Sequence, residues 1–281
     1  MKIGVSTLAF GKKSREQIVQ LAEAYDWTIE FSSSFPHSAD MADFFKSLKI
    51  DRFAHNYFPA PEQPFVLNLA STDNNIRTKS IAHCIQGLKI SKLAGANCFS
   101  AHAGFCIDPD PKTLGRALNV EQKMDRNLNW SFFLESVSII VREAEHLEMS
   151  FYIENNVTAP FNLRKDGQEV LLCSSASELV ELYNSINKNN FGILLDTAHL
   201  KVSANALNFN KNEAVKELRP YVKYIHHSDN SGEKDTNESL DDSYWFLRFI
   251  KDFKDITHIL EVKNITVKEI LNQISLLENH G

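Results

Sequence analysis

The sequence predicts a single α/β domain, residues 1–281, folded as one (βα)8 TIM barrel, and three observations lead to this fold class. With 281 residues and 43% hydrophobic content, the chain has the length of such barrels, which commonly run to about 250 residues in one domain. Short strand-like apolar runs alternate eight times with longer amphipathic stretches, as in repeated βα units around a parallel sheet. Acidic and imidazole side chains end several late strands, where the functional face of such a barrel lies.

The expected strands are short apolar runs with the alternation of a β-strand. In chain order they span 2–8, 27–32, 51–56, 97–102, 149–154, 191–196, 222–227 and 257–262. The expected helices follow them at 14–25, 39–48, 73–94, 131–147, 175–188, 211–219, 241–253 and 266–278. Eight such pairs are enough to close a barrel.

The segment 73–94 shows the helical pattern most clearly. Its apolar side chains recur near the spacing of one helix face, at Ile76, Ile81, Cys84, Ile85, Leu88, Ile90 and Leu93. Asp73 is suited to cap the start of this helix, and Gly95 is a residue type that commonly ends one. The longest stretches without periodicity all follow strands, so we expect the C-terminal ends of the strands to form the functional face. These stretches are 103–130, 155–174 and 228–242.

Charge, hydrophobic segments and cysteine content limit the expected partners, location and metal ligands of the chain. The formal net charge of −6 and the pI of about 5.9 disfavour a nucleic acid partner without excluding one. The N-terminal segment lacks the apolar core of a signal peptide, and no segment reaches the roughly 18 apolar residues of a membrane span, so we expect a cytoplasmic protein. The four cysteines form no Cys-x-x-Cys pair, which favours reduced, buried thiols and leaves His, Asp and Glu as candidate metal ligands.

Four side chains that can bind metal end four successive late strands: Glu154, Asp196, His226 and Glu261. Because side chains alternate along a strand, inward-facing ligands at these positions leave apolar neighbours facing the helices. These neighbours are Phe151, Ile153, Ile193, Leu195 and Leu260. Three carboxylates that converge on one barrel mouth repel one another unless a cation lies among them. The sequence therefore predicts a divalent metal ion (Zn, Mn, Mg or Co) at these four residues.

His55 and His102 also end strands and would join the same mouth. Each residue has a structural alternative: these two histidines could be hydrogen-bonded core residues, Asp196 could be a helix N-cap, and the two glutamates could form buried salt bridges. Of the adjacent His226 and His227 only one can face inward, and strand parity favours His226, which leaves His227 for packing or for contact with a residue that binds the metal. The remaining histidines are expected to be structural or exposed: His37, His83, His146, His258 and His280.

The stretches that carry these residues resemble the xylose isomerase-like barrel superfamily, from about residue 50 to residue 264. Several are similar to its apurinic-site endonuclease branch: His55-Asn56-Tyr57-Phe58, Val66-Leu67-Asn68-Leu69-Ala70-Ser71, His102-Ala103-Gly104, Glu154-Asn155, Asp196-Thr197-Ala198-His199 and Ile225-His226-His227-Ser228-Asp229. That resemblance implies one zinc at His55, His102 and Glu154, and a second at the four strand-end ligands. A third zinc would need His199 and an Asp-x-His pair. Here Asp235 is followed by Asn237 in place of the histidine, and an amide is a poor zinc ligand.

The sugar isomerase and epimerase branch of the superfamily needs only the metal held by Glu154, Asp196, His226 and Glu261. The resemblance to this branch implies proton transfer through an enediolate, with Glu154 and Glu261 as the acid/base pair and His226 polarising a substrate oxygen. We therefore expect a metal-dependent isomerase or epimerase of a sugar, a sugar phosphate or a polyol ketone. His55, His102, His199 and Asp235 are candidates for a second metal or for the substrate.

Two alternatives to the isomerase remain open: an endonuclease-like metal-dependent phosphodiesterase and a non-catalytic barrel. A dehydratase of a cyclic polyol, intermediate between the isomerase and the non-catalytic barrel, is not resolved by the sequence either. The expected partner is a small sugar-like substrate, and the chain could form a homo-oligomer. Arg164 and Lys165 could bind a phosphate or carboxylate, and a solvated basic pair is the simpler interpretation. Aromatic residues that could line the mouth or stack on a sugar are Tyr244, Trp245, Phe58 and Phe105.

Overall fold

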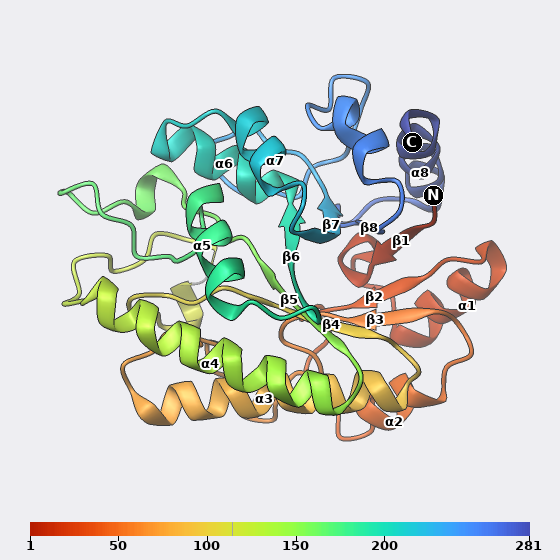
Figure 1. Ribbon diagram of the computed structural model, residues 1–281. Coiled ribbons are helices and arrows are strands. Elements are labelled where there is room, and N and C mark those ends of the chain that lie inside the picture. The colour runs from red at the N-terminus through yellow and green to blue at the C-terminus, as the bar shows by residue number, and fades with distance from the viewer. Residues whose placement is uncertain (114) are drawn as a thin grey trace.

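In the computed structural model, eight parallel strands form one sheet that curls into a barrel (Figure 1). The structure describes residues 1–113 and 115–281. The strands are β1 (Ile3–Ser6), β2 (Ile29–Phe31), β3 (Arg52–Ala54), β4 (Cys98–His102), β5 (Ser150–Glu154), β6 (Phe191–Asp196), β7 (Val222–His227) and β8 (Thr257–Leu260). Each lies inside the range expected from the sequence, so the predicted (βα)8 barrel is confirmed.

The strands follow the order β3-β2-β1-β8-β7-β6-β5-β4, so β1 and β8 pair with each other. The two edge strands, β3 and β4, meet at a parallel bridge between His55 and Ser100. There the Asn56 N–H donates to Ser100 O at 2.6 Å. The barrel is therefore nearly closed, and its closing point lies beside one of the candidate histidines.

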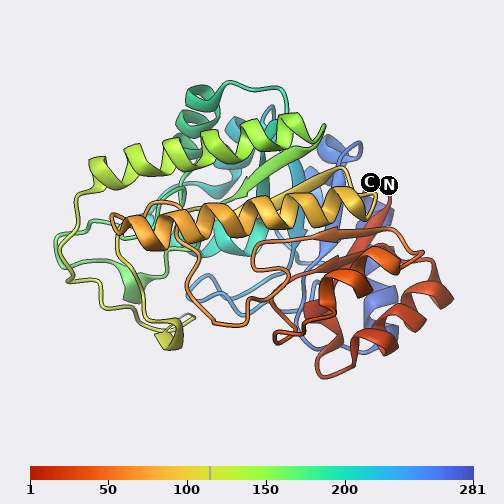
Figure 2. The same ribbon diagram turned by 90° about the horizontal axis from the view of Figure 1, so that it is seen from below.

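The helices surround the barrel, and the long α3 and α4 run side by side outside β4 and β5 (Figures 1 and 2). The α-helices are α1 (Arg15–Tyr25), α2 (Met41–Ser47), α3 (Asn74–Leu93), α4 (Arg126–His146), α5 (Ala176–Ile186), α6 (Thr197–Leu207), α7 (Lys211–Leu218) and α8 (Val267–His280). Short 3-10 helices are η1 (Thr7–Phe10), η2 (Pro111–Thr113), η3 (Pro160–Asn162) and η4 (Leu247–Phe253). Among the described residues, no helix is long and apolar enough to cross a membrane.

Two helical segments differ from the expectation. Helix α6 begins directly after β6, where the sequence predicted none. It is buried on several sides, so it lacks the one-sided apolar stripe that marks a surface helix. The expected helix 241–253 is reduced to the 3-10 helix η4. Aromatic residues of this segment pack on one another, for example Phe246 with Phe249 and Phe253.

The core has two parts, as the strand alternation predicted. Inside the barrel, Cys98, Leu194, Tyr224 and Ile259 form a small cluster with Phe53 and Tyr152. The larger cluster lies between the strands and the helices, and it contains all five residues that were expected to face outward: Phe151, Ile153, Ile193, Leu195 and Leu260. All four cysteines are buried and free. The alternation therefore directs the polar strand ends toward the mouth of the barrel.

Candidate metal centre

The four expected metal ligands come together at the C-terminal ends of the strands. Each of Glu154, Asp196, His226 and Glu261 offers a ligand atom, and these atoms all lie within 4.8 Å of one another. His226 Nδ1 lies 2.8 Å from Glu261 Oε2, 3.6 Å from Glu154 Oε1 and 4.0 Å from Asp196 Oδ2. Adjacent parallel strands end at the same edge of the barrel, which explains how residues far apart in sequence meet here.

A second group of ligand atoms shares Glu154 with the first. Glu154 Oε2 lies 3.1 Å from His55 Nε2 and 3.0 Å from His102 Nε2. His55 follows β3 and His102 ends β4, so these two residues lie on either side of the closing point of the barrel. Glu154 therefore directs one carboxylate oxygen toward each group.

The two carboxylate oxygens of Asp196 have different surroundings. Its Oδ1 accepts a hydrogen bond from the His199 N–H at 2.7 Å and so caps helix α6. Its Oδ2 has no hydrogen-bond partner among residues 1–113 and 115–281, and it faces His226 Nδ1. One carboxylate can therefore cap a helix and still offer an oxygen to a metal ion.

His199 and Asp235 lie near the shared carboxylate. His199 Nε2 is 3.4 Å from Asp235 Oδ2, and His199 Nδ1 lies 2.9 Å from Asn155 O and 3.4 Å from Glu154 Oε1. Asn237 lines the same cavity, and its side-chain amide donates to Ser228 Oγ at 3.4 Å. This part of the site thus has two residues that can bind metal and an amide beside them.

The donor set fits a divalent cation. Both oxygens of Glu154, Asp196 Oδ2 and His226 Nδ1 are buried and have no hydrogen-bond partner within the part of the chain that the structure describes. They approach one another closely without hydrogen-bond geometry, as ligand atoms do when they face a shared ion. Buried polar atoms without partners are costly, so a cation bound among them would stabilise the folded chain.

The pKa values of Asp196 and Glu154 are shifted in opposite directions. Burial raises the pKa of Asp196 to about 7, and the negative charges of Glu154, Asp235 and Glu261 add to that increase while His199 opposes it. Burial also acts to raise the pKa of Glu154, but His102 and His55 outweigh it and hold that pKa well below its usual value. A cation would favour the ionised form of both acids.

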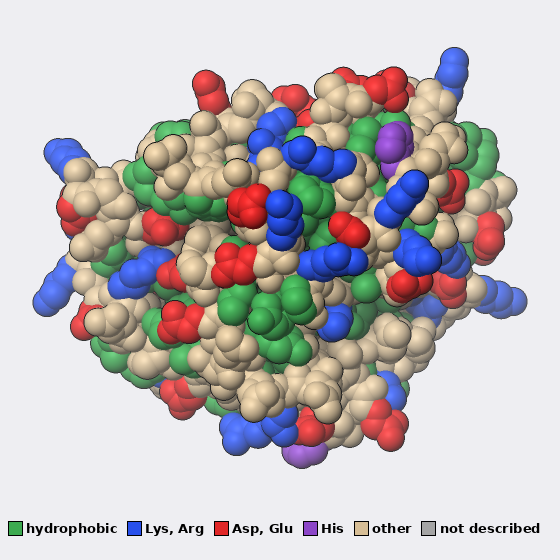
Figure 3. All heavy atoms as spheres, turned by 45° about the horizontal axis from the view of Figure 1, so that its top comes forward, with side chains coloured by type: hydrophobic (Ala, Val, Ile, Leu, Met, Phe, Trp, Pro, Cys, Tyr) green, Lys and Arg blue, Asp and Glu red, His purple; other side chains and the backbone are tan. Residues whose placement is uncertain are grey.

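A cavity of about 540 Å³ opens above these residues. Its polar lining includes His55, His102, His199, Asp235, Glu261, Asn56, Asn156 and the run Ser32, Ser33 and Ser34. Aromatic side chains on its wall are Tyr57, Phe65, Phe105 and Phe161, and two cationic residues, Arg116 and Lys234, also reach it. The face of the molecule seen in Figure 3 carries basic and acidic side chains interspersed with one another.

Two residues considered for substrate binding, Arg164 and Tyr244, have structural contacts instead, as does His227. The Arg164 guanidinium donates to Val120 O at 2.5 Å and to Gln122 O at 2.9 Å, so it supports a loop. Tyr244 is buried, with its hydroxyl 2.6 Å from Thr197 Oγ1. His227 packs away from the mouth, with Nε2 2.8 Å from His258 Nδ1. The expected packing role of His227 is consistent with these contacts.

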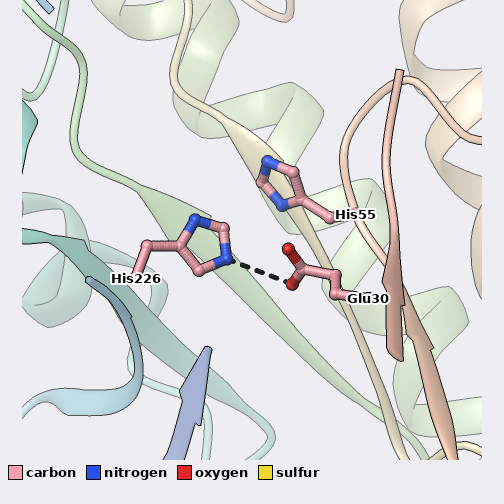
Figure 4. Close-up of side chains that lie close together, drawn as sticks. All are labelled: Glu30, His55 and His226. Atoms are coloured by element: carbon pink, nitrogen blue, oxygen red, sulfur yellow. Dashed lines mark hydrogen bonds and ion pairs between the residues drawn. The ribbon is translucent and has the colours of Figure 1, made fainter. Parts of the chain in front are cut away.

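Glu30 is a further acid of the site that was not expected from the sequence. This residue lies in β2, is fully buried, and directs its carboxylate toward His226 (Figure 4). The available signal was its position between Ile29 and Phe31, which makes it an inward-facing acid in an otherwise apolar strand. Because Glu30 lies in the middle of β2 and not at its end, the pattern of strand-end ligands did not include it.

Solved structures that resemble this chain share its fold over nearly their whole length. A D-tagatose 3-epimerase-like protein superposes with a TM-score of 0.75 at 18% identity, covering 100% of this chain and 97% of that one. A Thermus thermophilus protein soaked with ZnCl2 gives 0.68 at 17% identity, covering 99% of each chain. D-psicose 3-epimerase with D-tagatose, from Clostridium cellulolyticum, gives 0.65 at 15% identity, covering 100% and 95%.

These low identities show the fold alone, and no curated protein matches the chain by sequence. The family model described as a xylose isomerase-like TIM barrel matches residues 6–275. That match spans most of the barrel and includes every candidate ligand described above. The chain therefore belongs to the xylose isomerase-like TIM barrel family.

Proposed function

We propose that this chain is a metal-dependent isomerase or epimerase of a sugar or a related polyol ketone. The observation that carries the proposal is the convergence of Glu154, Asp196, His226 and Glu261 beside a cavity of about 540 Å³. That volume suits a small ligand. The fold shared with D-psicose 3-epimerase and with a D-tagatose 3-epimerase-like protein supports the same reaction class.

Glu261 is the residue best placed to exchange a proton with a substrate. Its side chain is 13% exposed and lines the cavity, whereas that of Glu154 is 1% exposed. A bound divalent ion would polarise adjacent carbonyl and hydroxyl oxygens and acidify the C–H bond of the hydroxyl-bearing carbon. Glu261 would take this proton, and Glu154 would be its partner in returning one, which completes an epimerisation or isomerisation.

Hydroxyl groups on the cavity wall support a polyol as the substrate class. Ser34 Oγ lies 3.2 Å from both Thr7 Oγ1 and Ser32 Oγ. Such a hydroxyl network both donates and accepts hydrogen bonds, as recognition of sugar hydroxyls requires. Asn56 and Asn156 add further polar groups to the lining.

Exchange of substrate hydrogen with solvent deuterium tests the acid/base pair. A panel of ketoses incubated in D2O with the metal-loaded protein should show exchange at the carbon beside the carbonyl. Glu261→Gln and Glu154→Gln should each abolish it, while Glu233→Gln, in an exposed loop, should leave it unchanged. Metal content is measured for every variant. Exchange retained by both metal-loaded variants would refute the assigned roles.

A phosphodiesterase is the second candidate, and the group of His55, His102 and Glu154 favours it because it could hold a second ion beside the first. Asn237 stands in place of the histidine that the endonuclease branch supplies, and its amide is a poor ligand for a third ion. Incision of an abasic oligonucleotide, lost on adding a chelator, would support this candidate. One metal ion per chain and no incision would favour sugar chemistry.

A further inference from the structure

A buried carboxylate lies behind the imidazole of His226. Glu30 Oε2 is 3.1 Å from His226 Nε2, whereas the opposite ring nitrogen, Nδ1, faces Glu154, Asp196 and Glu261. Figure 4 shows Glu30, His55 and His226 directed toward one another, with the contact between Glu30 and His226 drawn as a dashed line. His226 therefore has an acid on each side of its ring.

Glu30 occupies a position where an acid is costly. It is 0% exposed and stands between Ile29 and Phe31, which are both fully buried. Its Oε2 accepts a hydrogen bond from the Tyr224 hydroxyl at 2.6 Å as well as lying next to His226. Its Oε1 has no hydrogen-bond partner among the residues that the structure describes. A buried carboxylate needs strong donors to remain ionised, and Tyr224 and His226 supply them here.

The contact between Glu30 and His226 decides which ring nitrogen of His226 can bind metal. A neutral imidazole carries one N–H and one lone pair. When Nε2–H donates to Glu30, the lone pair is left on Nδ1, which faces the three carboxylates. A metal-binding histidine commonly donates its other N–H to a carboxylate, which fixes the tautomer, orients the ring and makes the ligand more basic.

We propose that Glu30 is a positioning residue that holds His226 in the Nε2–H tautomer and so strengthens the binding of a divalent cation at Nδ1. The inference rests on the metal centre of the proposed function but not on its reaction. Tyr224 contributes by orienting the Glu30 carboxylate through its hydroxyl. Glu30 lies in β2, and His226 and Tyr224 lie in β7. These two strands do not pair, because β1 and β8 lie between them in the sheet. The side chains therefore meet inside the barrel.

The neighbouring histidines provide an internal comparison. His55 Nδ1 lies 2.9 Å from Ser100 Oγ, and His199 Nδ1 lies 2.9 Å from Asn155 O. These partners are neutral, whereas the partner of His226 is a carboxylate. Hydrogen bonds to charged groups are the stronger ones, so removing the charge at Glu30 should affect the affinity for metal clearly.

Glu30 could instead bind metal directly, because it, His55 and His226 offer ligand atoms that lie within 4.8 Å of one another. The two roles differ in a measurable way. Losing a direct ligand weakens its site so strongly that the ion drops out of the metal count. A positioning residue tunes a site that remains, so losing it changes the dissociation constant and leaves the count unchanged.

The test is zinc binding by full-length protein, measured as Kd by competition with a chromophoric chelator and as metal ions per chain by elemental analysis. Glu30→Gln keeps the shape but loses the charge, and its amide can donate to Nε2, which favours the wrong tautomer. We expect its Kd to rise ~10- to 100-fold with the same number of ions per chain. Tyr224→Phe should raise Kd roughly two- to tenfold, as the loss of one hydrogen bond predicts.

Glu178→Gln is the matched control. Glu178 is a partly buried acid whose Oε2 accepts a hydrogen bond from the Cys173 N–H at 2.9 Å, and it belongs to none of the three candidate ligand groups. Its Kd should equal that of the wild type. An unchanged Kd in folded Glu30→Gln, or the loss of one ion per chain, would overturn the proposal.

If Glu30→Gln does not fold, the Kd of Tyr224→Phe for zinc tests the proposal. An unchanged Kd in that variant would equally overturn it. Failure of the inference can be told from failure of the proposed function, because Kd is measured without substrate. A wild-type protein that binds zinc but exchanges no substrate hydrogen would refute only the proposed reaction.

Discussion

Glu154 Oε1 lies 3.6 Å from His226 Nδ1, while the other oxygen of the same carboxylate lies 3.0 Å from His102 Nε2. Glu154 thus belongs to two of the three groups of candidate ligands, and Asp196 belongs to only one. Removing one partner from a set of buried charges costs about 3–5 kcal/mol.

We therefore expect Glu154→Gln to raise Kd more than about 100-fold for each ion held by the two groups that share Glu154, since that energy corresponds to at least two orders of magnitude. Asp196→Asn should weaken only the ion held with His226 and Glu261. Isothermal titration with zinc, accompanied by elemental analysis, measures both. Equal binding losses in the two variants would contradict the shared role of Glu154.

Metal removal should lower the thermal stability of the chain. A ligand present at 100 times its Kd stabilises the folded state by about 2.7 kcal/mol, and 1 kcal/mol shifts Tm by roughly 2–4 °C in a chain of similar size. We expect EDTA to lower Tm by about 5–10 °C relative to the zinc-loaded protein. A variant with both Asp196→Asn and His226→Gln should respond much less, and an equal response would place the stabilising ion elsewhere.

Asn155 orders the backbone at Asp196. Its Oδ1 accepts the Asp196 N–H at 2.7 Å, and its Nδ2 donates to Asp196 O at 3.0 Å. Asn155→Ala leaves both buried backbone groups without these partners, so urea unfolding should show a loss of about 2–4 kcal/mol. The Kd for zinc should also rise, because Asp196 is then less firmly placed.

Asn205→Ala is the comparison for Asn155. Asn205 is exposed, and its side-chain amide donates to Gly232 O at 2.9 Å. Its replacement should cost about 1 kcal/mol and leave the Kd for zinc unchanged. A similar cost for the two alanine variants would argue against a special role for Asn155.

His83 makes stability depend on pH. Burial, with a smaller contribution from Lys79, lowers the pKa of this side chain from 6.5 to about 4. The unfolded chain therefore binds a proton at His83 between these values while the folded chain does not, so stability falls as pH decreases from 6.5 to 4. The lost stabilisation amounts to about 3 kcal/mol at most.

Urea unfolding at pH 7.0, 5.5 and 4.0 is expected to show a smaller decrease for His83→Phe than for the wild type. The phenyl ring suits the site, since the His83 ring lies 5.2 Å from the Tyr57 ring and 5.9 Å from the Phe65 ring. His146→Gln, at a side chain that is 78% exposed, should keep the wild-type pH profile. Identical profiles for all three proteins would contradict the assignment.

Regular alternation made much of the site predictable. A strand repeats every two residues, so an acid or imidazole in the inward register at a strand end is directed to the mouth of the barrel. This reasoning selected Glu154, Asp196, His226 and Glu261, and the structure brings them together. Helix α6 was not predicted, because its burial on several sides removes the one-sided apolar pattern on which helix prediction depends.

Periodicity and local length were enough to predict the succession of strands, the face on which the polar residues gather and the chemical types of the candidate ligands. Two relationships emerged only in the folded barrel: one carboxylate, Glu154, serves two groups, and Glu30 of β2 contacts His226 of β7. The contact between Glu30 and His226 crosses the barrel between strands that do not pair. Such distances depend on how the whole sheet closes, which no local repeat in the chain encodes.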